Sequence, residues 1–471
     1  MPRWRPATVT SEVARAAASL QAMTDQDLRL RRLARLRELE PRVRPATELL
    51  PPAPRPASLH GAERLAEAIG GRVVAGNGGS FVVVEREIHA PFDPRPLARL
   101  PFPIDTDRPL FLLDTETTGL GTAAGTVIFL IGMAWWDGPT LRVAQLWLPD
   151  HPDEGAFLDA LTAYMPPDAW LVTYNGRTFD WPLITTRFRL SRRAPPELAG
   201  HLDLLPISRV LFKHRLPDAR LASVEYGVAG VRRTGDLPGA LIPDRYFGWL
   251  RRGEAEPLLE VLEHNYQDVV SMARLLAVLT LRLADPSGHA ASHPGDLVGL
   301  ARAYRRRGRP EEALACLESA LALPDPDRPG WGPGAGFDRG QAWLDQAALF
   351  SSQGRPEEAV IAWQEAVRCG GRTAVMAWIG LAKHHEHRAR DPQGALAAAL
   401  AAERLVAQRR ALGRFDAFAE RDLRRRLVRL RRRVARRQAL ADRRQVRHAK
   451  KAMLFDGETG GSGREQQVPA A

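Results

Sequence analysis

The chain has 471 residues, 45% of them hydrophobic, and a formal net charge of +12. This length suits two or three domains, and the composition is ordinary for a soluble protein with buried cores. The first residues lack the apolar core of a secretory signal, and the longest apolar run, 127–136, is too short to span a bilayer. With only two cysteines, Cys316 and Cys369, we expect no disulfide, two small core residues and a cytoplasmic protein.

The first part of the chain contains two segments of different character. Residues 1–57 are rich in arginine and end in a proline-rich linker, to which the sequence assigns no function. Residues 58–108 predict a small lead-in subdomain with a short helix and a β-hairpin. The hairpin turn is expected at Asn77-Gly78, because this dipeptide favours tight turns between apolar strands.

Residues 109–285 have the pattern of an α/β domain, a mixed sheet with helices on its faces. Three apolar or alternating segments predict an antiparallel meander, and two further strands are interleaved with helices. The predicted strands are 110–113, 126–136, 141–148, 170–174 and 201–205, and the predicted helices are 157–164, 179–190 and 257–283.

Residues 294–412 predict an all-α region of repeated helices. The hexapeptide Gly-Arg-Pro-Glu-Glu-Ala occurs at 308–313 and again at 354–359. Small and apolar residues around both copies follow the spacing of tetratricopeptide (TPR) repeats, in which small residues let helical hairpins stack closely. A generic alanine-rich bundle is the alternative, and the repeated hexapeptide argues against it.

The positive charge is concentrated in a predicted basic helix at residues 413–455. Between Arg421 and Lys451 the chain has 15 lysines and arginines against two acids, so the rest of the chain is close to neutral. Apolar residues at helical spacing indicate that one face packs. The charged faces suit either nucleic-acid binding or a solvated cap on the repeats, and residues 456–471 are expected to be disordered.

Two carboxylates follow the first predicted strand of the α/β domain. Because residues two apart in a strand point to the same side, Asp114 and Glu116 project together. Two like charges at the end of a buried strand repel each other unless a cation lies between them. The alternative is an acidic turn in which each carboxylate caps a backbone amide.

Two further acids lie in similar positions. Asp180 begins a predicted helix directly after an apolar strand, where a helix-capping aspartate is the simplest interpretation. His264 and Asp268 are four residues apart within a long predicted helix and share a face. Alone, such a pair is most often a surface interaction.

Together these segments resemble the three motifs of the DEDD family of 3′–5′ exonucleases, which have the ribonuclease-H-like fold. The motifs are Asp114 to Leu120, Asn175 to Asp180, and His264 to Asp268. Three further stretches, 201–205, 221–225 and 236–239, are similar to the YprB-type ribonuclease-H-like domain, which is often followed by TPR repeats.

The resemblance implies a metal site and a role for each motif residue. The acids Asp114, Glu116, Asp180 and Asp268 would hold two divalent cations, Mg²⁺ or Mn²⁺, which prefer hard oxygen ligands. Contacts to the terminal nucleotide would come from Thr117, Gly119, Leu120 and Asn175. His264 stands at the spacing where one subfamily has tyrosine, and its imidazole would orient or deprotonate the attacking water.

The sequence thus predicts a metal-dependent nuclease, most simply a 3′–5′ exonuclease acting on DNA or RNA, with repeats that suit a protein partner and no membrane contact. A nucleic-acid-binding scaffold without turnover is one alternative, although a dead site has no reason to keep four mutually repelling acids. A structure-selective endonuclease on the same fold is another.

Overall fold

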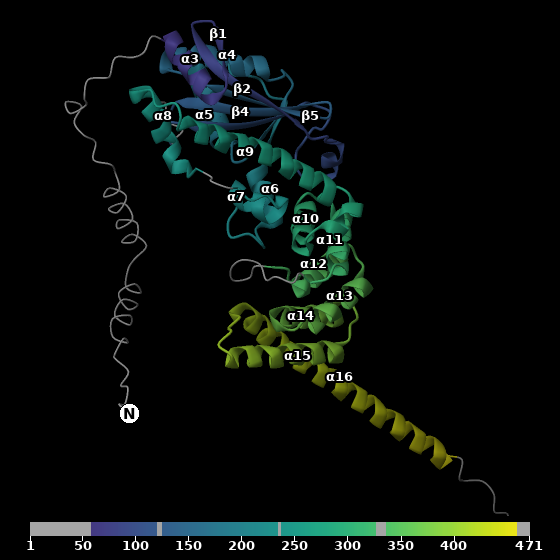
Figure 1. Ribbon diagram of the computed structural model, residues 1–471. Coiled ribbons are helices and arrows are strands. Elements are labelled where there is room, and N and C mark those ends of the chain that lie inside the picture. The colour runs from purple at the N-terminus through teal and green to yellow at the C-terminus, as the bar shows by residue number, and fades with distance from the viewer. Residues whose placement is uncertain (1–57, 120–124, 234–236, 326–335, 459–471) are drawn as a thin grey trace, which may run out of the picture. The chain divides into compact units, whose positions relative to one another are not determined.

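The computed structural model describes residues 58–119, 125–233, 237–325 and 336–458, and these belong to one compact unit, Ala57–Ala471 (Figure 1). The arginine-rich segment 1–57, Leu120 and residues 459–471 of the expected disordered tail lie outside the described residues.

A seven-stranded mixed sheet forms the centre of the α/β region, which confirms the predicted fold class. Its spatial order is β1-β2-β5-β4-β3-β6-β7. The strands are β1 (Arg72–Gly76), β2 (Gly79–His89), β3 (Leu110–Thr117), β4 (Ile128–Asp137), β5 (Thr140–Trp147), β6 (Trp170–Thr173) and β7 (Gly200–Asp203). The predicted meander is β3-β4-β5, and the predicted lead-in hairpin β1-β2 extends the same sheet by pairing with β5.

The strand directions place the chemistry at one edge of this sheet. β3 runs parallel to β6, and β6 runs parallel to β7, whereas β4 runs antiparallel to β3. The carboxyl ends of β3, β6 and β7 therefore meet at the same edge. In open sheets of this kind, ligands bind beyond the carboxyl ends of parallel strands.

Helices cover both faces of the sheet, because β3 is apolar on both sides. Phe111 and Leu113 point into one core, and Leu110 and Leu112 point into the other. The first core contains residues of α3 (Ser58–Ile69), α4 (Glu154–Tyr164), α5 (Asp180–Leu190) and α8 (Ile242–Arg252). The second contains residues of α6 (Leu204–Phe212), of α7 (Leu221–Val224) and of the second half of α9 (Leu258–Val278), whose first half packs in the first core.

The C-terminal region is helical, as predicted, and its helices pack as successive neighbours. The pairs are α10 (Pro294–Arg306) with α11 (Pro310–Ala322), α12 (Arg339–Ser352) with α13 (Pro356–Arg368), and α14 (Gly371–His387) with α15 (Pro392–Ala411). The core on the α6 and α9 side of the sheet continues without a break into α10–α13. Within the described residues, no helix combines the length and apolar character needed to cross a membrane.

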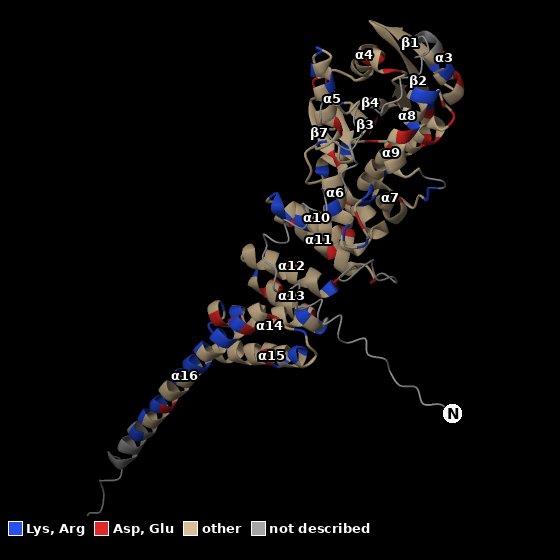
Figure 2. Ribbon diagram, turned by 90° about the vertical axis from the view of Figure 1, so that its left-hand side faces the viewer, with Lys and Arg blue, Asp and Glu red and all other residues tan. Residues whose placement is uncertain are grey.

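The basic helix is α16 (Ala417–Glu458), and its two halves differ (Figure 2). In the first half, Leu423, Leu427 and Leu430 are buried in a core shared with α14 and α15. The carboxylate of Glu386 on α14 accepts hydrogen bonds at 2.6–3.2 Å from three arginines of this half, namely Arg426, Arg429 and Arg433. The first half therefore caps the helical region, whereas side chains from Ala435 to His448 are exposed.

Both cysteines are free, as predicted, but only one is a core residue. Cys316 is buried in α11, whereas Cys369 is exposed directly after α13. The expectation of two core cysteines was wrong for Cys369, because it follows the last residue of the helix rather than lying on its buried face.

Candidate active site

A small acidic pocket lies at the carboxyl end of β3. It has a volume of about 200 Å³ and is lined by Asp114, Glu116, His264 and Asp268, together with Thr115, Thr117, Gly119, Phe179, Gly239, Ile242 and Pro243. The strand pairing of β3 with β4 is irregular between Glu116 and Thr117, so β3 leaves the regular sheet at the pocket. The predicted convergence of the first and third motifs is therefore present in the fold.

The carboxylate of Asp114 is held by a buried amide network. Asn265 of α9, which is fully buried, donates a hydrogen bond from Nδ2 to Asp114 Oδ2 at 2.9 Å. Gln145 of β5 donates from Nε2 to Asn265 Oδ1 at 2.9 Å and to the carbonyl of Leu262 at 2.8 Å. A donor chain therefore runs from β5 through α9 to the β3 carboxylate and fixes its orientation.

Gly132 of β4 provides the space for this network. It lies directly between the two ends, because the strand register pairs it with Asp114 on one side and with Gln145 on the other. A Cβ atom at position 132 would lie 2.1 Å from Oδ1 of Asn265. Any side chain at this position would therefore displace the asparagine that orients Asp114.

Asp180 approaches the site from the first turn of α5. Its side chain is buried and accepts a hydrogen bond from the Thr115 hydroxyl of β3. Burial raises the pKa of Asp180 to about 6, although the Thr115 hydrogen bond acts in the opposite direction. Asp180 does not line the pocket, yet it lies close enough to influence the charge on Asp114.

Asp268 is paired with a buried arginine that the sequence analysis did not single out. Arg233 forms ion pairs with both Asp268 and Glu225, and its side chain is only 8% exposed. His264 Nε2 lies 3.7 Å from Asp268 Oδ2 across one turn of α9. Burial raises the pKa of Asp268, while the charges of Arg233 and His264 counteract that effect.

The electrostatics of Asp114 test whether these acids suit a cation. Burial raises the pKa of the Asp114 carboxyl well above its ordinary value, and three neighbouring carboxylates raise it further. In order of effect, these are Asp268, Asp180 and Glu116. The other three predicted ligands therefore lie within electrostatic reach of Asp114. A group of carboxylates that repel one of their members in this way suits a divalent cation with a preference for hard oxygen ligands.

Comparison with known proteins agrees with this geometry. Residues 111–280 match the RNase_H_2 family of the RNase_H superfamily. This part of the chain is an RNase H superfamily domain. YprB of Bacillus subtilis (strain 168) is 34% identical to the chain over 285 residues, which are 60% of this chain and 66% of that protein. The chain thus spans just under two thirds of the length of this relative.

The predicted substrate contacts of the RNase H domain divide between two places. Thr117 and Gly119 line the acidic pocket, whereas Leu120 lies outside the described residues. Asn175 does not line this pocket. Its backbone has a positive φ of 72°, and its backbone N–H donates a hydrogen bond to Asp203 Oδ1 at 2.8 Å. Its side-chain oxygen accepts a hydrogen bond from the Thr178 hydroxyl at 3.0 Å.

Sequence reasoning missed the residues that hold the acids in place. Asn265 lies next to His264 inside the third motif, so its position beside a predicted catalytic residue was a usable signal. Glu225 ends the stretch 221–225 that is part of the family resemblance, whereas Arg233 and Gln145 come from distant segments, and no local pattern marks their contacts with the site.

A second group of ligand-type side chains lies elsewhere among the described residues. Each of His214, His293 and Asp296 offers one ligand atom, and these three atoms lie within 4.8 Å of one another. The Asp296 carboxylate also accepts hydrogen bonds from Arg215 Nε at 2.9 Å and Nη2 at 2.7 Å. Because His214 and Arg215 both bind Asp296 where α6 packs on α10, we interpret the group as a structural link between these helices.

Proposed function

We propose that the protein is a divalent-metal-dependent nuclease that hydrolyses phosphodiester bonds in DNA or RNA, and that it acts as a 3′–5′ exonuclease of the DEDD type. The observation that carries the proposal is the meeting of the carboxylates of Asp114, Glu116 and Asp268 in one small pocket, with Asp180 close enough to raise the pKa of Asp114. Carboxylates held this close together with little solvent around them are costly unless a bound cation compensates their charge, so the arrangement favours a metal site over a structural role.

The four predicted acids, of which Asp180 lies just outside the pocket lining, would hold two cations, with Asp114 positioned by Asn265 and Asp268 by Arg233. When bound there, Mg²⁺ or Mn²⁺ would lower the pKa of the attacking water and offset the charge that develops on the leaving oxygen. The neighbouring backbone at Thr117 and Gly119 would contact the terminal nucleotide, since both residues line the pocket.

His264 would orient the attacking water and accept its proton. The imidazole lines the pocket and lies beside Asp268, and its side chain is 15% exposed, so that water can reach it. A general base must be within hydrogen-bonding reach of the proton that it removes, and the pocket wall is the place where this condition can be met.

The paired helices of residues 294–412 would act as TPR-type repeats that bind a protein partner. The repeated hexapeptide starts the second helix of two successive pairs, α11 and α13, as expected for repeats of one structural unit. The proposed boundaries are 109–285 for the nuclease, 294–412 for the repeats and 413–455 for the basic helix.

The decisive experiment incubates the full chain with 5′-end-labelled single- and double-stranded DNA and RNA, with Mg²⁺, Mn²⁺ or EDTA. A 3′–5′ exonuclease shortens the labelled strand progressively, requires the cation and spares a circular single strand. Cleavage of the circle would instead indicate an endonuclease.

Three substitutions complete the test. Asp114→Ala and Asp268→Ala should abolish cleavage, because each removes a ligand. The matched control is Glu256→Ala, which removes an exposed carboxylate just before α9 and should cleave like the original protein. Undiminished cleavage by both aspartate variants would refute the site, and a protein that binds but never cleaves would be the scaffold of the alternative hypothesis.

A further inference from the structure

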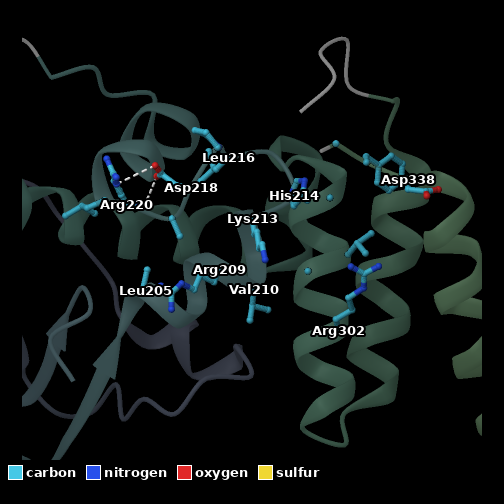
Figure 3. Close-up of a pocket in the computed structure, with 18 of the residues that line it drawn as sticks. Leu205, Arg209, Val210, Lys213, His214, Leu216, Asp218, Arg220, Arg302 and Asp338 are labelled. Carbon is cyan, nitrogen blue, oxygen red and sulfur yellow. Dashed lines mark hydrogen bonds and ion pairs between the residues drawn. The ribbon is translucent and has the colours of Figure 1, made fainter. Parts of the chain in front are cut away.

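A second and larger cavity lies between the RNase H domain and the first repeat helices (Figure 3). It has a volume of about 1250 Å³. One wall comes from α6 and the segment 216–221, and the other from α10 and residues 336–341. Sites for small ligands usually occupy about 300–1,000 Å³, so this cavity has room for part of a polymer.

Four cations line this cavity, which we call the basic cavity: Arg209, Lys213, Arg220 and Arg302. Arg209 of α6 and Lys213, which directly follows α6, lie about one helical turn apart on the cavity side and are exposed (Figure 3). Neither side chain makes a hydrogen bond or ion pair with any residue that the structure describes. Arg302 is bound to Asp345 at 3.0 Å and still has a side chain that is 42% exposed.

The acids in the lining are already occupied by other contacts. Asp338 caps α12 by accepting a hydrogen bond from the backbone N–H of Gln341 at 2.9 Å. Asp218 accepts hydrogen bonds from the Arg220 amide at 3.0 Å and from the Ser223 hydroxyl at 2.6 Å. Asp218 also forms an ion pair with Arg220 at 3.6 Å. The lining thus has four cations against two carboxylates, so its net charge is positive.

The two walls of the basic cavity are fixed to each other. His214 and Arg215, at the end of α6, both bind Asp296 of α10. Gly299 lets the helices approach closely, since a Cβ atom there would lie 2.6 Å from the carbonyl oxygen of Val210. The cations are thus presented by a packed interface, which lowers the entropic cost of binding.

A single loop joins this cavity to the acidic pocket. Tyr174 and Asn175 line the basic cavity, and Phe179 of the same loop lines the acidic pocket. Four extended residues span at most about 14 Å, so the two sites are neighbours at the same sheet edge. The position of Asn175, away from the acids and in the wall of the basic cavity, fits a contact with nucleotides farther along a bound strand.

We propose that the basic cavity binds the sugar–phosphate backbone of a single-stranded nucleic acid whose end occupies the acidic pocket. This inference rests on the proposed nuclease function, and it assigns Arg209 and Lys213 to phosphates upstream of the cleaved bond. A single strand is the occupant because unpaired bases can stack on the aromatic rings of Tyr174 and Phe337, which also line the cavity.

The test measures binding of a fluorescein-labelled oligothymidylate to the full chain by anisotropy, in EDTA so that no cleavage occurs. The double variant Arg209→Ala, Lys213→Ala should lose two phosphate contacts and reduce the salt slope by about 1.4, at about 0.7 for each contact on a single strand. At about 50 mM salt the Kd of the double variant should be about tenfold higher than that of the original protein. Between about 50 and 200 mM salt the ratio of the two Kd values should fall about sevenfold.

The matched control is Arg305→Ala, Arg306→Ala, which removes the same charge from exposed positions on α10 outside the cavity lining. It should bind like the original protein. Equal weakening in the control, or unchanged Kd and salt slope in the cavity variant, would overturn the inference. Full competition by an acidic peptide such as polyglutamate would also overturn it.

These outcomes separate the inference from the nuclease proposal. Loss of binding in the cavity variant of a protein that never cleaves would refute the nuclease and leave the cavity as a binding site. Metal-dependent cleavage together with unchanged binding by the cavity variant would refute only the assignment of the cavity.

Discussion

The acidic pocket and the basic cavity lie on either side of one loop, and they are built in opposite ways. The pocket, about 200 Å³ in volume, collects carboxylates from β3 and α9. Its acids are held by hydrogen bonds to neighbouring side chains, as with Asp114 and Asn265. The cavity, about 1250 Å³ in volume, presents exposed arginine and lysine side chains on helix surfaces.

The difference follows from the ligand that each site would bind. A small divalent cation requires oxygen ligands in a fixed arrangement, and burial strengthens their attraction to it. A phosphate backbone is long and hydrated, and solvent-exposed cations can bind it in several conformations. In the proposed function, the carboxylates of the acidic pocket would carry out the chemistry, and the exposed arginine and lysine side chains of the basic cavity would bind the strand. Both sites lie at one edge of the sheet.

The largest expected effect comes from a substitution that changes the proposed chemistry and leaves strand binding unchanged. His264→Ala should lower kcat by roughly 10²–10⁴-fold, because it removes the proposed general base. Oligonucleotide affinity should not change, since His264 is absent from the basic cavity. Single-turnover cleavage and anisotropy measure the two effects. Near-normal turnover would return His264 to the simple surface pairing with Asp268 that the sequence also allowed.

A smaller effect is expected from Asn265→Leu, which removes the hydrogen bond to Asp114 and leaves every proposed ligand in place. Loss of such a supporting contact typically costs about 10–100-fold in activity or metal affinity. The hydrogen bond from Asn265 lowers the pKa of Asp114. Without it that pKa rises, so the acidic limb of the pH–rate profile should move to higher pH.

A merely structural role of Asn265 would give a different result. In that case Asn265→Leu would lower thermal stability and leave the pH profile unchanged. Asn265→Asp keeps the shape of the side chain but adds a carboxylate beside Asp114, and its pH profile should shift in the same direction as that of the leucine variant.

The smallest effect concerns the basic helix, which competes with the cavity as the source of attraction for nucleic acid. Ending the chain after Val434 removes the exposed half of α16 and keeps the leucines and arginines that pack on α14 and α15. We expect a Kd about two- to fivefold higher and a flatter salt dependence, with kcat retained. A larger loss than in the Arg209 and Lys213 variant would make the helix the main recruiting surface.

Much of the fold could be predicted from local patterns. The apolar run before Asp114 predicted β3, and three successive apolar or alternating segments predicted the β3-β4-β5 meander, because hydrophobic periodicity acts over short distances. Each acid follows a recognisable strand or lies on a recognisable helix, but only the resemblance to the DEDD motifs joined the acids into one predicted site.

The remaining features depend on contacts between distant segments. Arg233 and Asp268 are 35 residues apart, and Gln145 and Asn265 are 120 apart. The basic cavity exists only because α6 packs on α10, so neither Arg209 nor Lys213 was distinctive in the sequence. The role of α16 as a cap likewise depends on Glu386, the one acidic residue of α14. Nothing in the local sequence of α14 indicates this contact.

The continuous core that joins α9 to α10–α13 has a consequence for how the molecule unfolds. The change from α/β to all-α architecture near residue 290 is a change of pattern without a break in packing. Leu300, Leu314 and Leu317 of the helical region share that core with Met272 and Leu276 of α9. Calorimetry should therefore record one cooperative transition for both regions, and proteolysis near residue 290 should destabilise the nuclease fold rather than release it intact.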